Sequence, residues 1–167
     1  YGPSYDQLNQ INVVAAHDAG YSGAGILVCL LDTGFFTDHE ALVDQPVVAE
    51  WDFINNDPET QNEPGDHQNQ HNHGTYTFSA LGGAHEGDLY GPAYGSEFIS
   101  CKTESYPDEM PIEEDWYVAG LEWADSLGAD VVSTSLGYLD WYVFEDLDGN
   151  TAVTTIGVDI AVANGIV

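Results

Sequence analysis

Apolar positions fall into short continuous runs separated by stretches of helical spacing. Ile26-Leu27-Val28-Cys29-Leu30-Leu31 lies between a glycine and Asp-Thr-Gly, and a run of that length predicts a strand buried on both faces. Similar runs predict strands at 46–53, 97–102 and 130–135, and Ile166-Val167 has the pattern of the start of a fifth strand.

Helical spacing of apolar residues indicates four helices, the first before these strands and the other three between them. They are expected over 7–19, 74–81, 113–126 and 151–163, each with a glycine at or after its end. The polar segment 55–72 and the aromatic, acidic segment 138–150 are expected to be loops. Strands alternating with helices predict an α/β fold, a three-layer doubly wound parallel sheet with right-handed crossovers, incomplete in this chain.

Charge excludes two classes of partner. The 167 residues carry 29 acids against a single Lys or Arg, for a net charge of −28. Nothing here can neutralise phosphates, so nucleic acid and anionic membrane surfaces are excluded. No apolar run reaches the roughly 20 residues of a membrane helix, so no membrane span is expected. A solvated acidic surface fits a secreted or salt-adapted protein; the alternative is that basic residues of a second polypeptide complete the fold.

Three residues inside apolar runs have structural interpretations. Cys29 and Cys101 are too few for a disulfide scaffold; buried free thiols are expected, with a bridge as the alternative. Lys102 lies at a strand end among acids. It is expected to be a structural charge partner and not a catalytic lysine.

Polar side chains gather where the predicted strands end, which is where parallel sheets place their functional groups. Asp32 follows the first strand, His73-Gly74-Thr75 opens a helix, and Ser133-Thr134-Ser135 closes the fourth strand. Nucleophilic peptide hydrolysis needs a histidine as general base and a carboxylate that orients it. Asp32 and His73 could supply that pair.

Four segments resemble motifs of one family, the subtilisin-like serine proteases (subtilases). Gly23-Ala24-Gly25 through Leu31-Asp32-Thr33-Gly34 resembles the catalytic-aspartate motif, and His71-Asn72-His73-Gly74-Thr75 resembles the catalytic-histidine motif. Gly120-Leu121-Glu122-Trp123-Ala124 followed by Asp130-Val131-Val132-Ser133-Thr134-Ser135-Leu136-Gly137 is similar to the family's helix and substrate-cleft strand. Ala163-Asn164-Gly165-Ile166-Val167 is similar to the approach to the oxyanion-hole asparagine. The four occur in the family's order.

The resemblance implies a role for each matching residue. Asp32 would orient His73, and His73 would act as general base. The backbone of Ser135, Leu136 and Gly137 would pair with an extended protein or peptide substrate as an added strand. Met110, Pro111 and Ile112 correspond to the opposite wall of the cleft. Acids between 104 and 115 would weakly favour basic or polar substrate side chains.

Departures from the family pattern limit what the chain can do. The family's oxyanion-hole asparagine and its Gly-Thr-Ser nucleophile would both lie beyond Val167, and no Gly-Thr-Ser occurs in the 167 residues. The histidine motif continues as Tyr76-Thr77-Phe78, where the family has another histidine and a small apolar residue. A calcium-binding aspartate that the family often carries matches Ala41 here, so the resemblance does not supply that site.

These observations predict that residues 1–167 are the N-terminal part of a single subtilisin-like peptidase domain. The chain begins without Met and ends on an apolar strand opening, which suggests processing or trimming, and a second polypeptide would carry the serine. The predicted function is a secreted serine endopeptidase whose chain alone is inactive. The alternative is a non-catalytic binding or structural module of the same fold, or an inactive fragment.

Metal-site alternatives are weaker. His67, His71 and His73 could bind zinc, although such loops more often hold one functional histidine. Asp146-x-Asp148-Gly149-Asn150 begins like a calcium loop, but the glycine position rejects an EF-hand and leaves only an irregular calcium site open. No metal ligand is assigned and the predicted chemistry needs no cofactor; structural calcium stays an open expectation.

Overall fold

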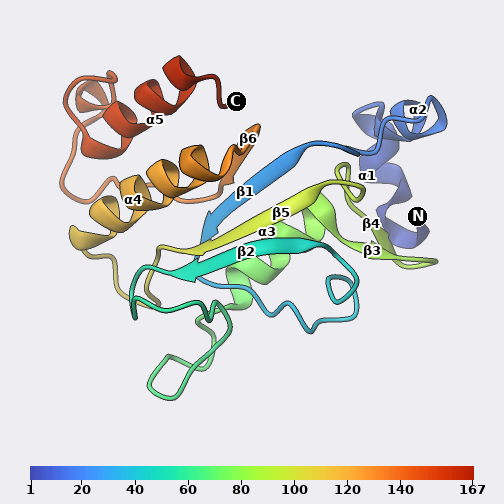
Figure 1. Cartoon of the computed structure of the whole chain (residues 1–167), viewed down its shortest axis with the longest axis horizontal. Helices are drawn as coiled ribbons and strands as arrows, with labels where there is room; N and C mark the ends of the chain where they lie inside the picture. Colours follow the sequence, from blue (N-terminus) through green and yellow to red (C-terminus); the bar gives the residue numbers. More distant parts are fainter.

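A computed structural model describes all 167 residues (Figure 1). Its central sheet has four parallel strands in the order β2-β5-β1-β6. The strands are β1 (Leu27–Asp32), β2 (Val47–Asp52), β5 (Glu97–Lys102) and β6 (Val131–Thr134). All four strands predicted upstream of Ile166 are confirmed. β1 is an interior strand, so its carboxyl end opens between β5 and β6.

Helices cover both faces of this sheet, which confirms the three-layer α/β architecture. α3 (Asn72–Gly82) lies on one face. α4 (Ile112–Leu127) and α5 (Val153–Asn164) lie on the other, with α5 packed against α4 (Figure 1). Each agrees with a predicted helix to within two residues at either end.

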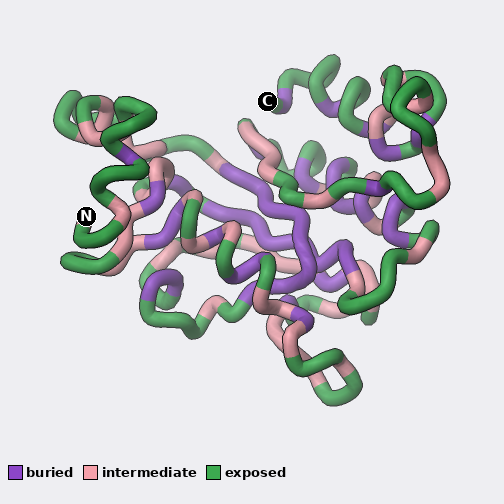
Figure 2. Tube along the Cα trace, turned by 180° about the vertical axis from the view of Figure 1, so that it is seen from behind, coloured by how far each residue is buried: buried purple, intermediate pink, exposed green.

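Alternating residues of β1 supply the two halves of the core, and Figure 2 shows the central strands as mostly buried. Cys29 and Leu31 pack toward α4, whereas Val28 and Leu30 pack toward α3. Neither face of β1 is left to solvent, as its unbroken apolar run predicts. The α4-side cluster also contains Ile99, Cys101, Tyr117, Leu121, Ala124, Ala129 and Tyr138, and the α3-side cluster contains Phe35, Leu42, Phe78 and Phe98.

The two cysteines meet inside the α4-side cluster. Cys29 and Cys101 lie on neighbouring strands with their Sγ atoms 3.5 Å apart, and both are fully buried and unbridged. The expected buried free thiols are therefore what the structure shows. Burial raises the pKa of the Cys101 thiol, as does the neighbouring Cys29.

The prediction of one helix over 7–19 is wrong. The segment forms α1 (Tyr5–Gln10) and α2 (Val13–Asp18), separated at Asn12, whose φ of 68° lies in the left-handed region. Asparagine tolerates that conformation better than most residues, so it ends the first helix without a glycine. A short hairpin of β3 (Ala84–His85) and β4 (Leu89–Tyr90) is also present; strands of two residues are too short to give a periodic signal.

Short turns complete the element order. 3-10 turns cover Gly2–Ser4 and Phe144–Asp146. Beyond α5, the Val132 N–H donates to the Val167 carbonyl (2.9 Å) and the Val167 N–H donates to Asp130 (3.1 Å). These bonds place the end of the chain along the outer edge of β6, where the predicted fifth strand would extend the sheet. None of the helices has the length and apolar character needed to cross a bilayer.

Candidate active site

Asp32 and His73 meet at the carboxyl edge of the sheet. Asp32 ends β1 and its side chain is 2% exposed, whereas the side chain of His73, in the first turn of α3, is 51% exposed. Asp32 Oδ1 lies 2.7 Å from His73 Nδ1. An ionised carboxylate only accepts hydrogen bonds, so Nδ1 carries the proton and Nε2 is the basic nitrogen. The pair has the geometry of a general base held by a buried carboxylate.

Two further donors hold the Asp32 carboxylate. The Thr33 N–H donates to Oδ1 (2.7 Å) and the Thr77 hydroxyl donates to Oδ2 (3.0 Å). Thr77 lies four residues after His73, on the same face of α3. The sequence singled out Thr77 only as a departure from the family pattern. Its spacing from His73 was the signal that it would reach the same carboxylate.

A glycine allows α3 to approach β1 closely. A Cβ at Gly74 would collide with the carbonyl oxygen of Gly34 and would lie 3.0 Å from the Cβ of Asp32. Gly34 itself has a φ of 122°, a conformation that residues with a side chain rarely adopt. The two glycines therefore set how near the start of α3 comes to the end of β1, and with it the contact between His73 and Asp32.

Gln70, which the sequence did not single out, connects the turn after β1 to the segment after β5. Its side-chain amide donates to the carbonyls of Thr33 (2.7 Å) and Glu104 (2.6 Å), and its Oε1 accepts the N–H of Tyr106 (2.8 Å). Gln70 is 3% exposed, and Thr33 and Glu104 are buried as well, so the two carbonyls have little access to water. Its signal in the sequence was only that it is a polar residue just before the histidine motif.

Replacing Gln70 with leucine is expected to lower the free energy of unfolding by about 2–4 kcal/mol. The apolar side chain would leave the buried carbonyls of Thr33 and Glu104 without partners, at about 1–2 kcal/mol for each carbonyl. Urea unfolding monitored by tryptophan fluorescence measures the change. Gln45→Leu, at a half-buried position in the turn before β2, is the control. Equal stability of the Gln70 variant and its parent would show that Gln70 is not a structural link.

One predicted cleft wall follows the C-terminal end of β6, and the other leads into the N-terminal end of α4. Ser135, Leu136 and Gly137 directly follow β6, and none of their backbone groups bonds to another backbone group. Leu136 and Gly137 line a cavity of about 180 Å³ beside Tyr138 and α5. That free backbone is what an added peptide strand would require.

The opposite wall is the segment leading into α4. Met110 is half-buried, and Pro111 and Ile112 are exposed where α4 begins. The buried Glu113 carboxylate fixes this segment, because Oε1 accepts the N–H of Ser105 (2.9 Å) and Oε2 accepts that of Met110 (2.7 Å). The predicted wall residues thus lie in the segment before α4 and in the segment after β6. No hydrogen bond joins Met110, Pro111 or Ile112 to Ser135–Gly137.

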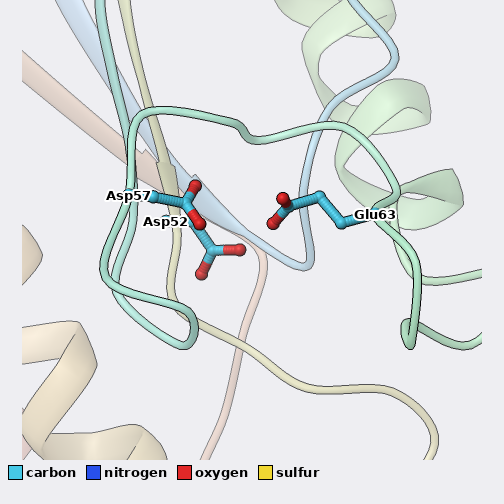
Figure 3. Close-up of side chains that lie close together, drawn as sticks. All are labelled: Asp52, Asp57 and Glu63. Atoms are coloured by element: carbon cyan, nitrogen blue, oxygen red, sulfur yellow. The ribbon is translucent and has the colours of Figure 1, made fainter.

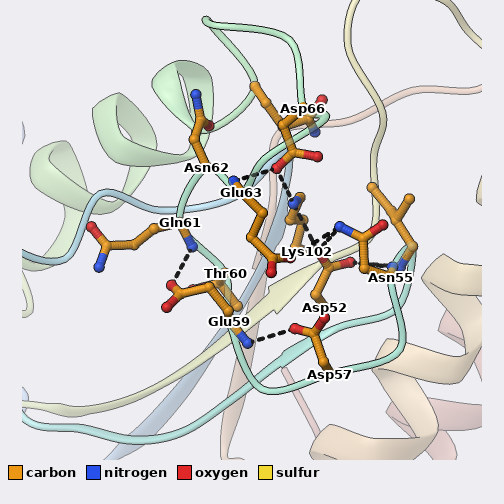
Figure 4. A network of polar contacts seen from close by, with 12 residues as sticks. Asp52, Asn55, Asp57, Glu59, Thr60, Gln61, Asn62, Glu63, Asp66 and Lys102 are labelled. Atoms are coloured by element: carbon orange, nitrogen blue, oxygen red, sulfur yellow. Dashed lines mark hydrogen bonds and ion pairs between the residues drawn. The ribbon is translucent and has the colours of Figure 1, made fainter.

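Lys102, the only lysine, is completely buried in an ion-pair network with Asp52 and Asp66 (Figure 4). Its Nζ lies 2.7 Å from Asp52 Oδ2 and 2.7 Å from Asp66 Oδ2. The expected structural charge partner is confirmed. Burial alone would lower the pKa of Lys102, but hydrogen bonds and charges from the two aspartates outweigh burial and raise it. Burial likewise opposes the Lys102 and Glu63 hydrogen bonds that lower the pKa of Asp66.

Asp52, Asp57 and Glu63 bring three carboxylates together (Figure 3), and Lys102 lies beside Asp52 (Figure 4). Their oxygens lie within 4.8 Å of one another. Asp52 already accepts the N–H groups of Ile54 and Asn55 as well as the Lys102 ammonium. A metal ion here would meet a resident ammonium, so these residues do not fit a calcium site well.

The other predicted metal positions also have other partners. His71 Nδ1 accepts the Asn62 N–H (3.0 Å) and His67 Nδ1 accepts that of Asn69 (3.2 Å), while His73 turns to Asp32. The three rings form no common set of ligands. Asp148 Oδ1 accepts the N–H groups of Asn150 and Thr151. The carboxylate therefore stabilises a turn of its own loop.

Comparison with known proteins identifies a family and several relatives. The model of the subtilase family matches residues 23–166. Subtilisin of Bacillus pumilus is 28% identical over 161 residues, 96% of this chain and 51% of the relative. Subtilisin E of Bacillus subtilis is 27% identical over 96% of this chain and 37% of its own length.

A third relative, the minor extracellular protease Vpr of Bacillus subtilis, is 29% identical over 97% of this chain and 19% of its own length. The chain thus spans about half or less of the length of these relatives. Because the family match covers most of the residues, including the ends of β1, α3 and β6, the chain belongs to the subtilase family.

Proposed function

We propose that this chain supplies the aspartate and histidine of a serine endopeptidase. The observation that carries the proposal is the 2.7 Å contact between the buried Asp32 carboxylate and Nδ1 of the half-exposed His73. Family membership and relatives named as subtilisins support it.

In the proposed reaction, His73 Nε2 takes the proton of a serine hydroxyl as the serine oxygen attacks a peptide carbonyl. The imidazolium then gives that proton to the leaving amine, and the acyl-enzyme is hydrolysed with water by the same base. Asp32 keeps the Nδ1–H tautomer and stabilises the imidazolium. We propose that the serine and the oxyanion donors come from polypeptide outside residues 1–167, which the greater length of the relatives supports. Residues 1–167 alone are then inactive.

The substrate proposed is an extended segment of a protein or peptide. Ser135, Leu136 and Gly137 have unbonded backbone groups along which such a segment can lie as an added strand. Met110, Pro111 and Ile112 form the opposite wall in this proposal. Triad chemistry of this kind needs no metal or organic cofactor. A secreted protein is proposed because one relative is named an extracellular protease.

A fluorophosphonate probe tests the function on the complete protein that contains this chain. Such probes react with an activated serine, so intact mass should show one probe added per molecule. His73→Ala should abolish the labelling, and His85→Ala, a histidine in the β3–β4 hairpin, should not. The peptide that carries the label shows whether the serine belongs to the same chain or to a second polypeptide. A folded protein that stays unlabelled would contradict the proposal and favour a non-catalytic module.

A further inference from the structure

One side-chain hydrogen bond joins the two segments that form the proposed cleft walls. Glu104 lies two residues after β5 and Tyr138 directly follows Gly137. The Tyr138 hydroxyl donates to Glu104 Oε2 over 2.9 Å, and each residue is 5% exposed. Neither residue is part of the Asp32–His73 pair, so the catalytic chemistry does not account for this contact.

We propose that Glu104 and Tyr138 are positioning residues that tie the two cleft walls together, and that the wall held by Glu113 keeps its place only while Glu104 is neutral. This inference rests on the proposed peptidase function. Glu104 continues into the segment whose backbone Glu113 and Gln70 hold, and Tyr138 continues from the strand on which the substrate would lie. A tie between them therefore sets the spacing of the walls.

All the charged side chains near Glu104 are acidic. The carboxylates of Glu109 and Glu113 lie within 4.8 Å of its own, and Asp32 adds a weaker repulsion. Gln70 contacts only its backbone oxygen. Tyr138 packs its ring edgewise on Tyr117, with centroids 5.8 Å apart. The single lysine is held by Asp52 and Asp66 and does not balance this group.

A neutral Glu104 is the form that this environment favours. Burial, and next the charge of Glu113, raise the Glu104 pKa to about 8, although the Tyr138 hydrogen bond acts in the opposite direction. Burial and the nearby Glu104 also raise the pKa of Tyr138, so the phenol keeps its proton. As the pH rises, Glu104 is thus the first of the two to change charge. Its anion repels Glu113, which holds the Ser105 and Met110 backbone in place.

The test compares the complete protein with its Glu104→Gln variant from pH 6 to pH 9.5. Glutamine stays neutral and its oxygen can still accept the Tyr138 hydroxyl. We expect KM for a peptide substrate to rise in the parent above pH 8 by up to about tenfold, because the Glu104 anion repels the Glu113 carboxylate that holds the Met110 backbone. KM of the variant should stay level, and kcat should change little in both. Tyr138→Phe should have the raised KM at every pH.

Glu122→Gln, the same chemical change at an exposed position of α4, is the matched control and should keep the KM profile of the parent. Equal KM profiles for the parent and Glu104→Gln would overturn the proposal. So would a Tyr138→Phe variant with the KM of the parent.

A stability measurement tests the proton without relying on activity. A folded pKa of about 8 against an ordinary value of 4.5 means that the proton stabilises the fold fully below about pH 4.5. That stabilisation is lost as the pH rises toward 8. The unfolding constant of the parent should rise relative to Glu104→Gln by up to about tenfold per pH unit in this window.

The two readouts separate the two proposals. An inactive protein that shows the stability difference would refute the peptidase function and leave the proton-dependent tie standing. Absence of that difference would overturn the tie even in an active protease.

Discussion

Changing Asp32 to asparagine in the complete protein is expected to lower kcat for peptide hydrolysis by about 10⁴-fold, a magnitude taken from related serine proteases. Asparagine has nearly the same shape, but it lacks the negative charge that lies 2.7 Å from His73 Nδ1. The imidazolium formed when His73 takes a proton would then lose its stabilising partner. Steady-state hydrolysis of a chromogenic peptide measures the effect.

Asp44→Asn provides the matched control for this prediction. Asp44 is exposed in the turn before β2, so its loss should leave kcat unchanged. The Asp32 variant should also unfold cooperatively, because a lost fold would lower activity for a different reason. A folded Asp32→Asn protein whose kcat stays within tenfold of the parent would remove Asp32 from the catalytic machinery.

The largest effect on stability is expected from Lys102→Met. Methionine removes the ammonium between Asp52 and Asp66. The buried Asp52 carboxylate and the Asp66 carboxylate, whose side chain is 14% exposed, are then left without their cation. Breaking a buried ion pair from one side costs about 3–5 kcal/mol. The free energy of unfolding from urea titration at pH 7 should fall by that amount.

The pH dependence of this variant identifies the cause. In the parent, Lys102 lowers the pKa of Asp66, so this stabilisation is present above the ordinary pKa of 3.8 and is lost as the pH falls below it. The difference in the free energy of unfolding between the parent and the variant should therefore become smaller in acid, where the aspartates become neutral. Adding Asp66→Asn should recover part of the loss at pH 7. A deficit below about 1 kcal/mol at pH 7 would show that the pair is only a surface-like contact.

The sequence predicted the parts of the molecule that short contiguous patterns determine. Cys29 and Leu31 alternate with Val28 and Leu30, which is why both faces of β1 could be assigned to the core. Asp32 and His73 could be paired because each stands at the end of a recognisable element. In the structure, the two side chains are in contact.

Contacts that depend on the third dimension could not be predicted. Gln70 bonds to residues 34 and 37 positions away, and Glu104 bonds to Tyr138 across 34 positions. No local pattern distinguishes these residues from other polar residues of loops. The break at Asn12 was not predicted for a different reason. The helical spacing of apolar residues continues across Asn12, whereas its backbone leaves the helical conformation.

The burial of the only lysine also has a practical meaning. Lys102 is 0% exposed and the chain has no arginine to offer beside it. The folded chain therefore presents no side-chain amine to reagents or ligases that modify lysine, and no site to a protease that cuts after basic residues. Modification and cleavage at Lys102 both require the 52–66 loop to separate from β5. Cleavage at Lys102 therefore shows that the chain has unfolded at least locally.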